Sequence, residues 1–177
     1  MIQVRLFTDA AVGKNCPGGV GFVLLNEEED TPFYYEVRHA TPDGMTQIEA
    51  ELYGILSGLE IVEHVIFSHN LRAKSVFVSV YTDCQPALHA INHTNEQKTD
   101  VVRILCKRLT RLADSRYGDS PDDKAPGGGY GWYFLSAKRK KVPPKHRRFH
   151  AHMVRAHELS RAAKAAFRGL MRPDNGE

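Results

Sequence analysis

Three acidic residues lie at positions from which their side chains could act on one substrate. Asp9 ends the strand-like segment IQVRLFTDA, Asp83 ends SVFVSVYTD, and Glu51 lies in the first half of a segment with helical periodicity. If the two strands are neighbours in a sheet, the three carboxylates converge. Converging carboxylates stay ionised only when a cation compensates their charge, and Mg²⁺ is the usual cation. Two such ions would activate a water molecule and stabilise the leaving oxygen of a phosphodiester.

Each acid taken alone also has a purely structural explanation. An aspartate at the end of a strand is usually a turn former or a helix cap, and Asp83 could cap the helix that follows it. A glutamate at the edge of a helix is usually solvated. Glu49 lies on the opposite edge of the same helix, and spacing alone does not separate it from Glu51. Only the combination of the three acids favours a metal site.

The elements that would position these acids follow from the hydrophobic pattern. Their order is βββ-α-β-α-α-β-α, which predicts an α/β domain with a mixed five-stranded sheet, three antiparallel strands first and parallel additions after them. The predicted strands are 2–10, 20–28, 33–40, 75–83 and 130–137. The predicted helices are 45–65, 84–92, 99–114 and a last helix that contains RAHELSRAAKAA and ends near residue 170. We expect one domain over residues 1–170 and a short polar tail over 171–177.

The helix predicted at 45–65 places Glu51 at the edge of its apolar face. Gly54 and Gly58 lie on the same side. Glycine is costly inside a helix, so these two residues predict a close approach to a neighbouring backbone.

Three segments together resemble the type 1 ribonuclease H family. They are FTDAAVGKNCPGGVGFVL, IEAELYGILSGLE and VYTDCQPALHAI, in the family's order. The matching residues are Thr8, Asp9, Ala50, Glu51, Leu52, Leu59, Glu60, Thr82, Asp83 and Gln85. The resemblance covers residues 1–93 well and resumes at GWYFLSA and the last helix. It implies a ribonuclease H-like fold and favours Glu51 over Glu49.

The resemblance also implies an activity and a set of site residues. The family cuts the RNA strand of an RNA–DNA hybrid with two divalent metal ions, Mg²⁺ or Mn²⁺, held first by Asp9, Glu51 and Asp83. Gln85 and Gln47 match positions that touch the minor groove of the hybrid. This chain has Ile48 at the position of a second asparagine of that kind. The difference concerns recognition of the 2′-hydroxyl, the group that distinguishes RNA from DNA.

The family's fourth metal ligand is an aspartate one turn into the final helix, and this chain has His157 there. Argonaute slicers use a histidine as fourth ligand, and retroelement-type ribonuclease H-like domains of plants show a similar Ala-His sequence. Three interpretations remain: a working ligand, which suits Mn²⁺ better than Mg²⁺; a degraded site in a module that binds RNA or hybrid within a larger assembly; or a solvent-facing helix residue. We favour the ligand.

A second histidine of the family lies in a mobile loop before the last helix and handles the attacking water or the product. His146, His150 and His152 occupy this region, and His150 is our choice because it is nearest to the expected helix start. No cysteine or acid accompanies these histidines, so a separate metal site is not expected.

A basic segment, KRKKVPPKHRRFH, precedes the last helix and is expected to form a loop over residues 138–149. Residues 138–172 hold twelve lysines and arginines against one acid, whereas residues 1–137 hold twelve against eighteen acids. Such a concentration indicates a polyanionic partner, and phosphate neutralisation by it is independent of sequence. The expected nucleic-acid contacts are Lys138, Arg139, Lys140, Lys141, Lys145, Arg147 and Arg148. Nuclear targeting or solubility would also explain the segment.

The remaining composition excludes some classes of protein. No run of eighteen apolar residues predicts a membrane span, and the amino terminus reads as a strand rather than a secretory signal. Three cysteines without metal spacing are expected to be reduced thiols. We therefore expect an intracellular protein, cytoplasmic or nucleoid-associated with a nuclear location left open, and the sequence names no protein partner.

Overall fold

The structure is a computed structural model in which the described residues are 2–13, 16–27, 32–71, 76–93, 99–114, 129–137 and 147–170. The nine elements follow the predicted order. The strands are β1 (Ile2–Ala11), β2 (Gly19–Asn26), β3 (Phe33–Ala40), β4 (Val76–Thr82) and β5 (Gly129–Phe134). The helices are α1 (Gln47–Ser68), α2 (Gln85–Asn92), α3 (Asp100–Asp114) and α4 (Arg147–Leu170).

The five strands form one mixed sheet in the order β3-β2-β1-β4-β5. The pairs β1–β2 and β2–β3 are antiparallel, and the pairs β1–β4 and β4–β5 are parallel. This confirms the predicted fold class. In the register of β1 and β4, Thr8 lies beside Thr82. The next residues along the two strands are Asp9 and Asp83, so the strand pairing itself brings the first two acids together.

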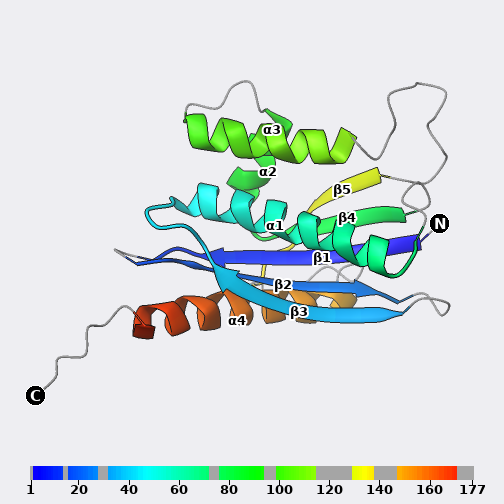
Figure 1. Cartoon of the computed structure of the whole chain (residues 1–177), viewed down its shortest axis with the longest axis horizontal. Helices are drawn as coiled ribbons and strands as arrows, with labels where there is room; N and C mark the ends of the chain where they lie inside the picture. Colours follow the sequence, from blue (N-terminus) through cyan, green and yellow to red (C-terminus); the bar gives the residue numbers. More distant parts are fainter. Residues whose placement is uncertain are drawn as a thin grey trace, which may run out of the picture.

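The helices cover the two faces of the sheet separately (Figure 1). Residues from α1, α2 and α3 pack with Val4 and Leu6 of β1 in one hydrophobic cluster. On the other face, Phe149, Met153, Ala156 and Leu159 of α4 pack on Phe7 and its neighbours in a second cluster. Side chains alternate along β1, so Asp9 faces α4 as Phe7 does. None of the described helices is long and apolar enough to cross a membrane.

The start of the last helix differs from the prediction. We expected His157 in its first turn and His150 in a loop before it, but α4 begins at Arg147. His150 and His152 therefore lie inside the helix, and His157 lies near its middle. Arg147 and Arg148, predicted at the end of a basic loop, form the helix start. The apolar side chains of Phe149 and Met153 explain the earlier start, because they are buried against the sheet at the i and i+4 positions of one helical face.

Glycines mark the places where helices approach the sheet most closely. A methyl group on Gly58 would meet side-chain carbons of Leu6, and one on Gly54 would meet the side chains of Val20 and Thr8. The expectation of backbone contact at Gly54 and Gly58 was therefore wrong, since side chains of the sheet fill this space. Backbone contact occurs instead at Gly21, where a methyl group would overlap backbone atoms of α4.

Candidate metal centre

Asp9 and Asp83 are held side by side by the sheet. Asp9 is buried, with 3% of its surface exposed, and Asp83 is half-buried directly after β4. The helix that follows β4 has Cys84 as its N-cap and no side-chain cap hydrogen bond. Asp83 is therefore not the N-cap residue of this helix, and it lines a cavity.

His157 reaches Asp9 from α4. Its Nδ1 lies 3.2 Å from Oδ2 of Asp9. Ligand atoms of Asp9, Asp83 and His157 all lie within 4.8 Å of one another, a grouping that could hold one metal ion. The interpretation of His157 as a solvent-facing residue is thus incorrect, because its ring faces the two acids.

Glu51 faces the same cavity from the first turns of α1, on the other face of the sheet. It is 2% exposed, and its Oε2 is buried and has no hydrogen-bond partner among the described residues. Gln47 donates its amide to Oε1 of Glu51 at 2.8 Å and to the carbonyl of Ala10 at 2.9 Å. The glutamate is therefore tied to the end of β1, with one oxygen left without a donor, as expected of an oxygen that serves a cation.

The neighbouring Glu49 has a different role. Its carboxylate accepts a hydrogen bond from the backbone nitrogen of Thr46 at 2.8 Å, and its own backbone nitrogen donates to the Thr46 hydroxyl. This reciprocal pair is a capping box that begins α1. The preference for Glu51 over Glu49 is consistent with this geometry.

The charges of the three acids act on one another. Burial raises the pKa of Glu51 well above its usual value, and the carboxylates of Asp9 and Asp83 raise it further. Burial, and then the charge of Glu51, also raise the pKa of Cys84 to about 11. In the metal-free protein this thiol is therefore protonated at neutral pH.

The donor set fits a hard divalent cation. Three carboxylates and one imidazole offer the ligands that suit Mg²⁺ and Mn²⁺. The orphaned oxygen of Glu51 and the mutual repulsion of the acids are both relieved by a cation between them. We therefore regard Asp9, Glu51, Asp83 and His157 as the residues that would hold such ions.

The raised pKa of Glu51 predicts a pH effect in the metal-free protein. The usual carboxyl pKa of 4.5 applies to the unfolded chain, and the folded value is higher. The folded protein therefore binds this proton more tightly, and stability is lost as the pH rises from 4.5 through the folded pKa. Glu51→Gln should remove this loss, so in EDTA at neutral pH the variant should unfold at a higher temperature than wild type.

The control for this experiment is Glu49→Gln, which keeps the capping box. Thermal unfolding of the three proteins is followed from acidic to neutral pH. A Glu51→Gln curve parallel to that of wild type across the whole range would contradict the prediction.

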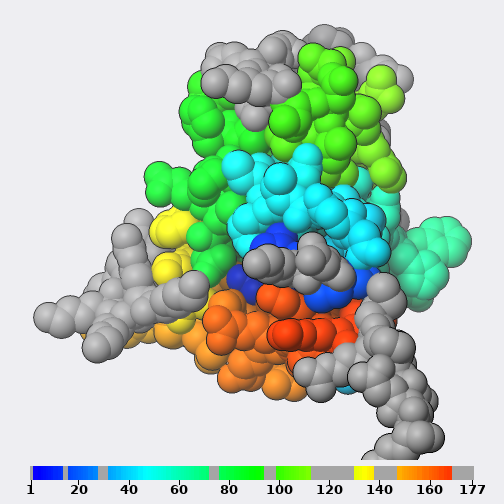
Figure 2. Space-filling view, turned by 90° about the vertical axis from the view of Figure 1, so that its left-hand side faces the viewer, coloured from blue at the N-terminus to red at the C-terminus, as the bar shows by residue number. Residues whose placement is uncertain are grey.

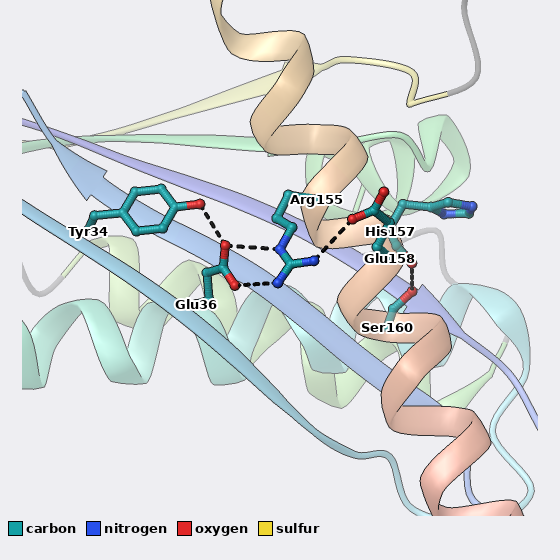
Figure 3. Close-up of polar contacts among 6 residues, drawn as sticks. All are labelled: Tyr34, Glu36, Arg155, His157, Glu158 and Ser160. Atoms are coloured by element: carbon teal, nitrogen blue, oxygen red, sulfur yellow. Dashed lines mark hydrogen bonds and ion pairs between the residues drawn. The ribbon is translucent and has the colours of Figure 1, made fainter.

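Ser160 adds a contact that the sequence did not suggest. Its side chain is fully buried and its hydroxyl donates to Oδ2 of Asp9, the same oxygen that His157 approaches. The hydroxyl also lies 2.9 Å from the carbonyl of His157, one turn earlier in α4 (Figure 3). One small side chain thus links the helix to the acid in β1.

Removal of the Ser160 hydroxyl should destabilise the metal-free protein. A buried hydrogen bond to a charged group contributes about 1.5–3 kcal/mol, so Ser160→Ala should lower the free energy of unfolding by about that amount in EDTA. The loss should shrink when Mn²⁺ is added, because the ion then compensates Asp9. Urea unfolding measures both quantities, with Ser79→Ala, another buried serine, as the control. An equal loss with and without Mn²⁺ would count against a metal at Asp9.

A separate set of polar contacts fixes α4 from its opposite side (Figure 3). Arg155 binds both carboxylate oxygens of Glu36 in β3, at 2.9 and 2.8 Å, and also contacts Glu158 at 3.1 Å. The hydroxyl of Tyr34 donates to Glu36 as well. The hydrogen bond from Arg155 is the main cause that lowers the pKa of Glu36. In Figure 3 the ring of His157 points away from this network.

The other predicted site residues are distributed more widely. Gln47 lines the cavity, and Gln85 is exposed at the start of α2 between two cavity residues, Cys84 and Pro86. His150 does not line the cavity, and its buried Nε2 has no hydrogen-bond partner in the part of the chain that the structure describes. His152 packs on Phe7 and Tyr34. Lys138, Arg139, Lys140, Lys141, Lys145 and His146 lie outside the described residues, as does the tail 171–177.

Three basic residues of α4 that were not among the predicted site residues share the cavity with the acids. They are Arg161, Lys164 and Arg168. The cavity has a volume of about 690 Å³ and lies where β1 and β4 end. Figure 2 looks onto this end of the molecule, with the cyan surface of α1 above and the orange-to-red surface of α4 below. The sequence did contain a signal for these three residues. From His157 onward they follow at intervals of four, three and four residues.

Comparison with known proteins gives a match in structure only. No protein-family model matches the chain, and no curated protein matches its sequence at a significant level. RNase H1 from the halophilic archaeon Halobacterium salinarum is 16% identical with a TM-score of 0.62, and the match covers 93% of this chain and 98% of that one.

Two further solved structures agree over similar lengths. The N-terminal RNase H domain of a Mycobacterium tuberculosis protein is 18% identical with a TM-score of 0.57, covering 96% of this chain and 99% of that one. LC11-RNase H1 from compost, solved in complex with an RNA/DNA hybrid, is 16% identical with a TM-score of 0.59, covering 92% and 97%. The chain therefore has the ribonuclease H-like fold that its sequence motifs resemble.

Proposed function

We propose that the protein is a metal-dependent endonuclease that hydrolyses the RNA strand of RNA–DNA hybrids. The observation that carries the proposal is the convergence of ligand atoms of Asp9, Asp83 and His157 within 4.8 Å, in a cavity that Glu51 also lines. Among the described residues, Oε2 of Glu51 has no hydrogen-bond partner. The fold is that of RNase H1 enzymes, one of which was solved with a hybrid. Two ions are proposed, with Asp9, Glu51, Asp83 and His157 as their ligands.

Each residue of the site would have a role that its position determines. Divalent ions in this site would lower the pKa of the attacking water and stabilise charge on the leaving oxygen. Asp9 and Asp83 would hold the ions between the ends of two strands, because the sheet register keeps these two residues adjacent. Ser160 holds Oδ2 of Asp9, and Gln47 holds Oε1 of Glu51, which limits the freedom of both carboxylates. Gln85 lies at the cavity edge, where it would meet the minor groove of the hybrid.

His157 decides between this function and a binding module without activity. A neutral imidazole binds Mn²⁺ well and Mg²⁺ less well. One feature favours the inactive alternative: Oδ2 of Asp9 already has contacts with both Ser160 and His157, which an entering ion must displace or share. The same experiment tests both functions.

The test is cleavage of an end-labelled RNA–DNA hybrid with Mg²⁺ or Mn²⁺ by wild type, His157→Ala and His157→Asp. We expect wild type to cut only the RNA strand, with more activity in Mn²⁺, and His157→Ala to be at least about tenfold slower. His157→Asp should shift the preference toward Mg²⁺, since carboxylate oxygen is the harder ligand. If wild type binds the hybrid but cuts nothing with either ion, the nuclease proposal is wrong and the binding module stands.

A further inference from the structure

We propose that Arg161, Lys164 and Arg168 form a phosphate-binding wall beside the metal centre, which holds the backbone of the strand to be cut. The inference rests on the proposed function, because it identifies the strand by its position next to Asp9 and Asp83. All three cations line the same cavity as these acids. A nucleic-acid backbone carries one negative charge per nucleotide. It is therefore the ligand whose charge complements the positive charge of the wall.

Helical geometry places the three cations on the site face of α4. From His157 they follow after four, seven and eleven residues, which at 3.6 residues per turn keeps them within about 40° of its direction. Arg161 and Arg168 are about 10.5 Å apart along the axis, since each residue rises 1.5 Å. That length spans about three nucleotides of a strand that rises 3.4 Å per nucleotide. The wall is therefore long enough to follow a backbone rather than a single phosphate.

The cations of the wall have no acidic partner among the described residues and can therefore bind a ligand. Within the described part of the chain, none of the three is in ion-pair contact with an acid. Arg155, on the opposite side of the same helix, shows the contrast, because Glu36 and Glu158 hold it (Figure 3). Arg161 and Arg168 are exposed, and Lys164 is half-buried.

The sheet fixes the wall relative to the acids. Gly19 and Gly21 of β2 lie directly under α4, and a methyl group on either would overlap backbone atoms of residues 156–164. The helix therefore has no space to move toward the sheet, and the Arg155 network holds its far side. A rigid row of cations binds a backbone at a smaller entropic cost than flexible side chains on a loop.

Electrostatics gives the wall a specific task. Asp9, Glu51 and Asp83 repel an approaching phosphate, and three cations that line the same cavity oppose that repulsion. Arginine can bind two phosphate oxygens at once, whereas lysine acts as a point charge, so the two arginines also orient the strand. The part of α4 that carries the wall is orange to red in Figure 2, at the surface of this end of the molecule.

Binding of a fluorescently labelled RNA–DNA hybrid in EDTA, across a salt series, tests the wall without cleavage. The variants are Arg161→Gln, Lys164→Gln and Arg168→Gln, because glutamine keeps length and helix propensity. Each should weaken binding roughly three- to tenfold at low salt and reduce the slope of log K against log salt by about 1. Arg161→Lys should keep the slope.

The matched control is Arg103→Gln in α3, which removes the same charge from an exposed arginine outside the cavity. The proposal is overturned if the wall variants bind like this control, even when wild type cuts the hybrid. Wild type could also bind the hybrid without cutting it, while the wall variants bind it more weakly and with a smaller salt slope. In that case the nuclease proposal is wrong and the phosphate-binding wall is supported. If wild type does not bind the hybrid at all, both fall.

Discussion

Asp83→Asn is expected to slow hybrid cleavage at least about a hundredfold while it stabilises the metal-free protein. A metal ion contributes several kcal/mol to charge stabilisation, and each 1.36 kcal/mol is a factor of ten in rate, so loss of one ligand has this scale. In the absence of metal, Asp83 raises the pKa of Glu51 by repulsion. Asparagine removes that repulsion with little change in shape.

Two measurements on the same protein check both halves of this result. Thermal unfolding in EDTA should give a higher midpoint for Asp83→Asn than for wild type. Wild type should gain about 2.7 kcal/mol at a Mn²⁺ concentration a hundredfold above Kd, equivalent to about 5–10 °C for a domain of this size, and the variant should gain much less. Asp43→Asn, an exposed acid outside the cavity, is the charge-matched control.

This pattern distinguishes a metal cage from an ordinary acidic surface. An unused acid would show no change in cleavage and no change in the Mn²⁺ response when it is replaced. A structural acid would lower the metal-free midpoint instead of raising it. Equal cleavage by Asp83→Asn and wild type would remove Asp83 from the site.

Gly21→Ala is expected to cost about 3 kcal/mol of unfolding free energy or more, the largest stability effect that we predict. The added methyl group would overlap the carbonyl of Ala156 and the backbone nitrogen of Ser160 in α4. Overpacking in a close-packed interior costs about 1–3 kcal/mol, and backbone atoms of a long helix yield less than a side chain does. The midpoint of thermal unfolding should fall by about 6–12 °C.

The same substitution should also damage the site, because Gly21 is the strand partner of Asp9. A displaced α4 would move Ser160 and His157 away from Asp9, so stabilisation by Mn²⁺ should decrease together with the midpoint. Gly54→Ala is the control: its methyl group would meet Cγ1 of Val20 at 3.0 Å and Oγ1 of Thr8 at 3.1 Å, side-chain contacts less severe than the backbone overlap at Gly21, and alanine favours the helix. Comparable losses for the two variants would contradict the role given to Gly21.

Local pattern was sufficient to predict most of the architecture. Alternating and buried apolar segments predicted all five strands, and helical periodicity predicted the four helices in their order. The acids at the ends of β1 and β4 were expected to converge on the condition that the two strands are neighbours, and the observed pairing of β1 with β4 meets this condition. The position of Glu51 near the head of α1 followed from its motif.

The last helix shows what local pattern could not supply. Its start at Arg147 depends on burial of Phe149 and Met153 against β1 and its neighbours, and these contacts include pairs such as Phe7 and Phe149 that are more than a hundred positions apart. Basic and proline-containing sequence before it indicated a loop, and tertiary packing overrode that preference for 147–152. The placement of His150 failed for this reason.

By itself, the sequence determined the order of the strands and helices and placed Asp9 and Asp83 at strand ends, because these are local properties of the chain. The choice of Glu51 and His157 came from the resemblance of the motifs to a family. Only the tertiary structure decided that Ser160 holds Asp9, that glycines of β2 let α4 come close enough, and that Arg161, Lys164 and Arg168 share the cavity with the acids. These facts depend on which side of α4 meets the sheet, and close packing between elements far apart in the chain sets that orientation.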